Sequence, residues 1–192
     1  IFQLRGKILN TLKVDIHKAL QNKEIDGMIN AFGLEVKDGK VIVDENKLTS
    51  RKIYQIKGRD ENKPFIQLIG NPLDIFKYTN DKIPDDILSY WPGPLTLIVN
   101  NKENNSTIAF RCPNDKWLSL LLNKINVPIY STSVNRSGKP ILNLIEDIKN
   151  EFESSVDLII DDGNRINSVA STIVNLSNGK VEVIRQGELK VN

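Results

Sequence analysis

The sequence predicts an α/β fold, a single domain built on a twisted mixed β-sheet with flanking helices. Short β-branched runs alternate along the chain with segments of helical periodicity, which is typical of this class. The 192 residues, 40% of them hydrophobic and 26% charged, suit one globular domain with a sizeable core. The polar loop 131–138 directly follows the apolar run 127–130, and α/β proteins build sites where a strand enters such a loop.

The first half of the chain alternates apolar periodicity with turn residues. Ile16, Ala19 and Leu20 lie on one side of a predicted helix, and Asp38 and Gly39 mark the turn of a predicted hairpin. A Gly70-Asn-Pro72 turn ends a strand. The predicted elements are a helix at 14–22, a strand at 28–32, a hairpin at 36–43, a helix at 46–56, a strand at 64–69 and short helices at 72–78 and 85–91.

The second half begins at the stiff turn 91–94, which leads into a strand. Asn114 or Asp115 is the expected cap of the helix that follows the next strand. The predicted strands lie at 95–99, 107–111, 127–131, 158–161, 170–175 and 181–185, and the predicted helices at 114–123 and 144–152.

Composition excludes several classes of site and of protein. The single cysteine, Cys112, rules out an internal disulfide and a cysteine-rich zinc site, and the single histidine, His17, rules out a histidine cluster. The net charge of +2 argues against a polybasic tail. No apolar run approaches the roughly 18 residues of a membrane span, and no signal-peptide pattern is seen, so we expect a cytoplasmic protein without a membrane partner.

Two cations, Lys57 and Arg59, stand two positions apart at the end of a predicted helix. In an extended segment they would point to the same side and face one anion. An arginine fork and a mobile lysine charge are what phosphate oxygens need. The alternative is a solvated basic turn, because Asp60 and Glu61 follow at once.

The loop 131–138 carries five hydroxyl or amide side chains in seven residues before its turn glycine, Gly138. Such groups hold phosphate or ribose, and glycine lets backbone N–H groups approach a ligand. The alternative is a turn that satisfies its own backbone. The chain contains neither a P-loop nor a Rossmann glycine fingerprint.

Other candidate residues lie at strand ends and in turns. Arg111 and Arg185 each end a predicted strand, where α/β sheets place ligands, although a surface arginine is an equal alternative. Asp161 and Asp162 offer oxygen ligands for Mg²⁺, but an acidic surface turn is favoured. A Cys112–His17 catalytic pair is disfavoured by context, and Trp91 and Trp117 are expected in the core.

Six motifs occur in an order that resembles the YrdC-like family of threonylcarbamoyl-adenylate synthases. The motifs are KGRDENKPF (57–65), WPGPLT (91–96), FRCPND (110–115), STSVNRSGKP (131–140), ASTIV (170–174) and IRQG (184–187). The resemblance covers residues 47–189 of a domain that spans 1–192, and residues 1–46 form its diverged part.

This resemblance implies an enzyme that joins L-threonine, bicarbonate and ATP into threonylcarbamoyl-AMP and releases pyrophosphate, with Mg²⁺ accompanying ATP. A partner transferase would then modify the adenosine beside the anticodon of certain tRNAs. The family's catalytic set falls on Lys57, Arg59, Ser133 and Asn135. The same four residues, with Arg111, Thr132 and Arg185, would bind ATP, and Phe32 and Ser171 would bind threonine, with no metal-ligating residue implied.

One segment departs from the family pattern. Residues 27–34 read GMINAFGL, so Met28, Ile29 and Asn30 stand where relatives carry threonines and an acid. Besides the synthase, two alternatives stay open: a nucleotide-binding paralogue with another small substrate, and a non-catalytic RNA-binding relative. ATP binding that depends on Lys57 would favour an enzyme, whereas tRNA binding with steep salt dependence would favour the RNA binder.

Overall fold

The computed structural model describes residues 35–37, 40–42, 51–156, 159–166 and 168–191. It divides into two compact units. The first unit takes its described residues from the ranges Ile1–Lys63 and Thr132–Asn167, and the second from Pro64–Ser131 and Ser168–Asn192. The assignment of residues 1–192 to one domain stays a prediction.

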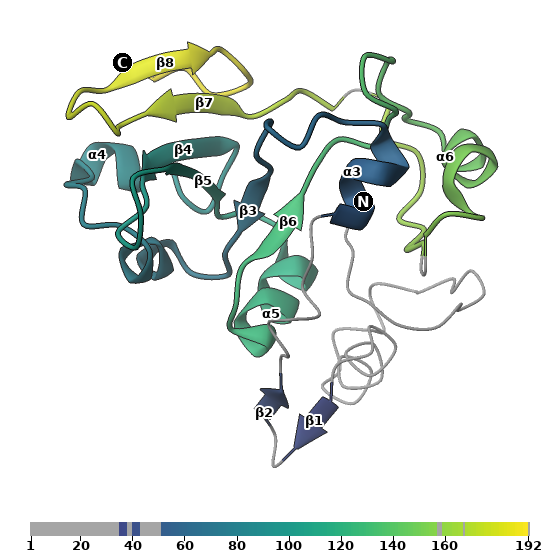
Figure 1. Cartoon of the computed structure of the whole chain (residues 1–192), viewed down its shortest axis with the longest axis horizontal. Helices are drawn as coiled ribbons and strands as arrows, with labels where there is room; N and C mark the ends of the chain where they lie inside the picture. Colours follow the sequence, from purple (N-terminus) through teal and green to yellow (C-terminus); the bar gives the residue numbers. More distant parts are fainter. Residues whose placement is uncertain (1–34, 38–39, 43–50, 157–158, 167, 192) are drawn as a thin grey trace. The chain divides into compact units, whose positions relative to one another are not determined.

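The second unit contains a six-stranded mixed sheet with strand order β6-β3-β5-β4-β7-β8 (Figure 1). The strands are β3 (Ile66–Leu68), β4 (Leu95–Asn100), β5 (Thr107–Arg111), β6 (Ile129–Ser131), β7 (Thr172–Asn175) and β8 (Glu182–Arg185). The β3–β5 and β4–β7 pairs are parallel and the other three pairs are antiparallel. The predicted mixed sheet is therefore confirmed, and each of its strands lies within about two residues of the range expected from sequence.

Three short helices belong to the described part of this unit. They are a 3-10 helix (Pro72–Lys77), α4 (Asp85–Leu88) and α5 (Lys116–Ile125). The Asp115 carboxylate accepts the Leu118 amide at 2.9 Å and caps α5, as the sequence predicted. Asn126 ends the helix in the left-handed conformation, with φ of 56°. No helix in the described part of the chain is long and apolar enough to cross a membrane.

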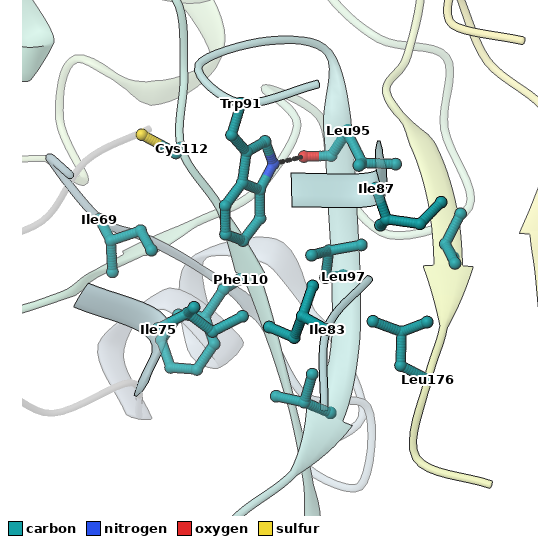
Figure 2. Packing of buried hydrophobic residues seen from close by; sticks show 12 residues of the cluster. Ile69, Ile75, Ile83, Ile87, Trp91, Leu95, Leu97, Phe110, Cys112 and Leu176 are labelled. Atoms are coloured by element: carbon teal, nitrogen blue, oxygen red, sulfur yellow. Dashed lines mark hydrogen bonds between the residues drawn. The ribbon is translucent and has the colours of Figure 1, made fainter. Parts of the chain in front are cut away.

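The core of the second unit forms around strand β4, which lies between β5 and β7 in the sheet. Figure 2 shows buried hydrophobic side chains packed together in this core. Leu95, Leu97 and Phe110 are fully buried. Trp91 is also buried and donates its indole N–H to the Leu95 carbonyl at 2.8 Å, so the ring packs without an unsatisfied donor. Trp117 is buried on α5, and the prediction that both tryptophans pack in the core is confirmed.

The first unit contains the hairpin β1 (Glu35–Lys37) and β2 (Lys40–Ile42) and the helices α3 (Arg51–Lys57) and α6 (Ile145–Phe152). The hairpin and both helices were predicted, and the strands pair antiparallel as expected for a tight turn. The strand predicted at 158–161 is wrong in the described part, where Ile160 forms only an isolated bridge. The Asp161 carboxylate instead accepts the Gly163 amide and starts a turn. The helix predicted at 14–22 and the strand at 28–32 lie outside the described residues.

Candidate functional site

The candidate site of the first unit begins at the C-terminus of α3, whose last residue is Lys57. Gly58 has φ of 58°, its amide bonds the Gln55 carbonyl at 3.2 Å, and the Arg59 amide bonds the Tyr54 carbonyl at 3.0 Å. These two hydrogen bonds define a Schellman motif, in which glycine adopts the left-handed conformation that other residues disfavour. The predicted end of a helix at Lys57 is therefore confirmed. The extended geometry considered for residues 57–59 is not seen, because Gly58 takes the left-handed conformation.

The Lys57 ammonium is held by the loop that follows β6. Its Nζ donates to the Ser133 carbonyl at 2.7 Å, to the Asn135 carbonyl at 2.6 Å and to Asn135 Oδ1 at 2.9 Å. The Ser133 hydroxyl also donates to Asn135 Oδ1, at 2.7 Å. We call this arrangement the Lys57 cage. It brings together three of the four residues predicted to be catalytic, although they lie up to 78 positions apart in the sequence.

Burial and a neighbouring cation shape the electrostatics of the Lys57 cage. Lys57 is only 2% exposed. Burial, reinforced by the positive charge of Arg59, lowers the pKa of the Lys57 ammonium from 10.5 to about 8. All three cage acceptors are neutral oxygens, which favour the ammonium less than a carboxylate would. An anion bound beside Lys57 and Arg59 would relieve this disfavoured charge, so the arrangement suits a phosphate.

The loop also satisfies its own polar groups. The Asn135 amide nitrogen donates to the Lys139 carbonyl at 2.6 Å, and the Lys139 backbone amide donates to the Arg136 carbonyl at 3.0 Å. Gly138 completes the turn with φ of 76°. Arg59 donates its Nε to the Lys63 carbonyl at 3.2 Å, and Thr132 is half-buried directly after β6. The loop therefore satisfies many of its own polar groups and also supplies the oxygens that bind the Lys57 ammonium.

A second group of predicted residues lies at the ends of strands in the second unit. Arg185, the last residue of β8, donates to the Ser171 carbonyl through Nε at 3.1 Å and Nη2 at 2.8 Å. Its Nη2 also lies 3.3 Å from the Ser171 hydroxyl, which in turn shares a 2.9 Å hydrogen bond with the Thr96 hydroxyl. Ser171 is thus fixed by two partners just before β7.

Arg111 ends β5, as predicted. Its Nε is buried and has no hydrogen-bond partner among the described residues. Burial lowers the pKa of the Arg111 guanidinium, while Glu188 opposes the shift and Arg185 adds to it. A buried, unpaired N–H on a charged group is costly unless a ligand fills it, so Arg111 is suited to receive an anion.

Three residues to which sequence reasoning gave no role lie beside Ser171. Thr96 is fully buried, and Thr172, also fully buried, donates its hydroxyl to the Leu189 carbonyl and accepts the Gly187 amide at 3.0 Å. A Cβ atom on Gly187 would lie 2.2 Å from a backbone oxygen of the neighbouring segment, so only glycine fits there. The position of Gly187 at the end of the IRQG motif was the sequence signal that could have identified it. The roles of Thr96 and Thr172 depend on contacts with residues distant in the sequence, which no local signal reveals.

The remaining candidates take other roles. Cys112 is fully buried, and burial raises the pKa of its thiol to about 11, so the thiol is protonated at neutral pH. Asp161 lies 3.9 Å from the Lys149 ammonium, and Asp162 pairs with Arg165, as expected for a surface turn. In the described part of the chain no group of three or more histidine, cysteine or acidic residues could hold a metal ion. Phe32 and His17 lie outside the described residues.

Comparison with known proteins shows which family the chain belongs to. The family model Sua5_yciO_yrdC, described as "Telomere recombination", matches residues 41–187. The chain belongs to the Sua5/YciO/YrdC family. A Methanocaldococcus jannaschii protein named "Putative threonylcarbamoyl-AMP synthase" is 30% identical over 195 residues, covering 97% of this chain and 89% of the relative. The Pyrococcus abyssi threonylcarbamoyl-AMP synthase is 28% identical over 178 residues and 85% of this chain. The resemblance inferred from the six motifs is therefore confirmed.

Solved structures share the fold of this Sua5/YciO/YrdC member. P. abyssi Sua5 complexed with L-threonine superimposes with a TM-score of 0.69 at 23% identity, over 96% of this chain and 58% of that one. Escherichia coli YciO gives the same TM-score at 20% identity, over 95% and 96% of the two chains. The chain spans only 52% of the P. abyssi synthase and 54% of the human one.

Proposed function

We propose that this chain is an L-threonylcarbamoyladenylate synthase, which forms threonylcarbamoyl-AMP and pyrophosphate from L-threonine, bicarbonate and ATP for tRNA modification. The observation that carries the proposal is the Lys57 cage, in which Lys57, Ser133 and Asn135 are joined by hydrogen bonds beside Arg59. These are the four residues that the family resemblance assigns to catalysis, and they also belong to the seven that it assigns to ATP binding. The names of the relatives support the same activity.

The proposed reaction is a displacement at the α-phosphate. The amino group of L-threonine adds to the carbon of bicarbonate and water leaves, which gives N-carboxythreonine. A carbamate oxygen of this species then forms a bond to the α-phosphorus while the bond to the bridging oxygen of pyrophosphate breaks. Negative charge develops on the leaving group, and fixed cations stabilise it without reorganising. Lys57 and Arg59 are proposed to supply that charge, with Arg111 and Arg185 as further ATP-binding residues. Mg²⁺ would accompany the ATP phosphates and neutralise part of their charge.

In this proposal the protein's side chains bind and position the substrates and form no covalent bond with them. The three protons of the Lys57 ammonium have neutral protein acceptors, so Lys57 acts by its charge and by holding the loop. The protonated Cys112 thiol, buried in the core, is not suited to nucleophilic attack. Thr132 is proposed to contact ATP beside Ser133. Ser171 is proposed to contact threonine, since its hydroxyl is oriented by Thr96 and Arg185.

The proposal is tested by mass spectrometry of reactions that contain the protein, ATP, Mg²⁺ and bicarbonate, with and without L-threonine. We expect threonylcarbamoyl-AMP only when threonine is present, and its loss in Lys57→Met. The matched control is Arg165→Ala, which removes an exposed arginine of the same unit. Folded wild-type protein that yields no product would overturn the proposal.

A specific sequence feature favours a second candidate. The apolar residues Met28 and Ile29 stand where relatives carry polar threonine-binding residues, so a paralogue could use another small substrate with the same nucleotide residues. ATP binding that depends on Lys57, without a threonine-dependent product, would favour this paralogue. Binding of tRNA with steep salt dependence and no ATP binding would favour an RNA-binding relative.

A further inference from the structure

We propose that Arg136 is a positioning residue of the nucleotide site. Its guanidinium links the C-terminus of α3 to α6 and so fixes the loop oxygens that surround Lys57. The inference concerns the architecture of the Lys57 cage, and its meaning for catalysis rests on the proposed function. It does not make Arg136 a ligand of ATP.

The first argument concerns the carbonyls at the end of α3. The last four carbonyls of a helix lack partners within it. The Schellman motif satisfies the first two of these, and the other two belong to Ile56 and Lys57. Arg136 Nη1 donates to the Ile56 carbonyl, and the Ser137 backbone amide donates to the Lys57 carbonyl at 2.8 Å. The loop therefore completes the helix end, and Arg136 also places a positive charge at the negative end of the helix dipole.

The second argument concerns what holds Arg136 itself. Its Nε donates to Glu151 Oε1 at 2.6 Å, and its Cζ lies 5.4 Å from the centroid of the Phe152 ring. Both partners lie on α6, and Phe152 is 1% exposed. The Glu151 pair is about 40% exposed and adds little energy alone, but the ring and the Ile56 carbonyl fix the plane of the guanidinium. Lysine cannot reproduce this planar fork.

The third argument is the reciprocity between the helix and the loop. α3 gives the Lys57 ammonium to Ser133 and Asn135, and the loop returns donors from Arg136 and Ser137 to the last carbonyls of α3. Asn135 supplies two of the three cage oxygens and directly precedes Arg136 in the chain. Displacement of the Arg136 side chain would therefore shift the backbone that carries both oxygens.

The experiment compares Arg136→Met, which keeps an apolar stem against Phe152, with Arg136→Lys and the control Arg165→Ala. The readout is the ¹⁵N NMR signal of the Lys57 ammonium, assigned by its absence in Lys57→Met, and its titration. We expect wild type and Arg165→Ala to share the same protected signal and a pKa of about 8. In Arg136→Met and Arg136→Lys, the signal should broaden and the pKa should rise toward 10.5, with about tenfold weaker ATP binding.

An unchanged Lys57 signal and pKa in a folded Arg136→Met protein would overturn the proposal. If Arg136→Met does not fold, the same measurement on Arg136→Lys decides it. Wild-type protein that does not bind ATP would count against the proposed function. The Lys57 signal would still report whether Arg136 organises the cage, so the two failures are distinguishable.

Discussion

The lowered pKa of Lys57 predicts an unusual dependence of stability on alkaline pH. In the unfolded chain, Lys57 keeps its proton up to pH 10.5, whereas in the folded protein it releases the proton at about pH 8. Between these two values the unfolded state binds more protons, so raising the pH favours the folded state. The contribution of Lys57 to the free energy of unfolding should therefore increase from pH 8 to 10.5.

The size of this increase follows from the shift. The difference of 10.5 minus 8 is 2.5 units, and each unit corresponds to about 1.4 kcal/mol. The full shift amounts to about 3–4 kcal/mol, which is an upper limit because water that reaches the ammonium screens its charge. The slope should vanish below pH 7, where both states are protonated.

The assay is urea unfolding of the wild type and of Lys57→Met from pH 6.5 to pH 10.5. Methionine does not titrate. Subtracting the two free energies of unfolding therefore removes the pH dependence that comes from tyrosines and from the other lysines. We expect the difference, wild type minus variant, to rise by about 1–3 kcal/mol across the range. A flat difference would refute the assigned burial of the ammonium, and a falling one would require a carboxylate near Lys57 that stabilises its charge.

Three further predictions concern the two groups of site residues. Thr96→Val removes the buried hydrogen bond to Ser171 and should lower the free energy of unfolding by about 1–2 kcal/mol in urea titrations; no loss would mean that the bond is not formed. Gly187→Ala should lower the free energy of unfolding more than Gly58→Ala, because a Cβ on Gly187 would lie 2.2 Å from a backbone oxygen. At Gly58 there is space for a Cβ, and only the positive φ is unfavourable, by about 1–2 kcal/mol. Equal decreases in melting temperature for the two variants would contradict this. ATP affinity should fall as the pH rises above about 8 and Lys57 loses its charge, whereas a pH-independent Kd would show that the charge is not used.

Local signals in the sequence were sufficient for most elements of the fold. Asn114 or Asp115 was expected to cap the helix because both directly precede its apolar residues, and the structure shows that Asp115 accepts the Leu118 amide. Arg111 and Arg185 were placed at strand ends because apolar runs stop there, and both indeed end strands. These predictions needed only neighbours in the chain.

The backbone conformation after Lys57 and the partners of the site residues could not be predicted from local signals alone. The sequence placed Lys57 at the end of a helix, and α3 does end there. The extended geometry that would turn Lys57 and Arg59 to one side is not seen, because Gly58 between them takes the left-handed conformation. The role of Arg136 depends on the Ile56 carbonyl 80 positions away, and that of Thr96 on Ser171 75 positions away. Such pairings arise from tertiary packing, which no local pattern in one sequence reveals.

The most direct test of the proposed synthase follows the carbon of bicarbonate into the product. The protein is incubated with ATP, Mg²⁺, L-threonine and ¹³C-bicarbonate, and threonylcarbamoyl-AMP is analysed by mass spectrometry beside parallel reactions of Lys57→Met and Arg165→Ala. The account predicts ¹³C-labelled threonylcarbamoyl-AMP from wild type and Arg165→Ala, and none from Lys57→Met. Folded wild-type protein that binds ATP yet forms no labelled product, or Lys57→Met that forms as much as wild type, would contradict it.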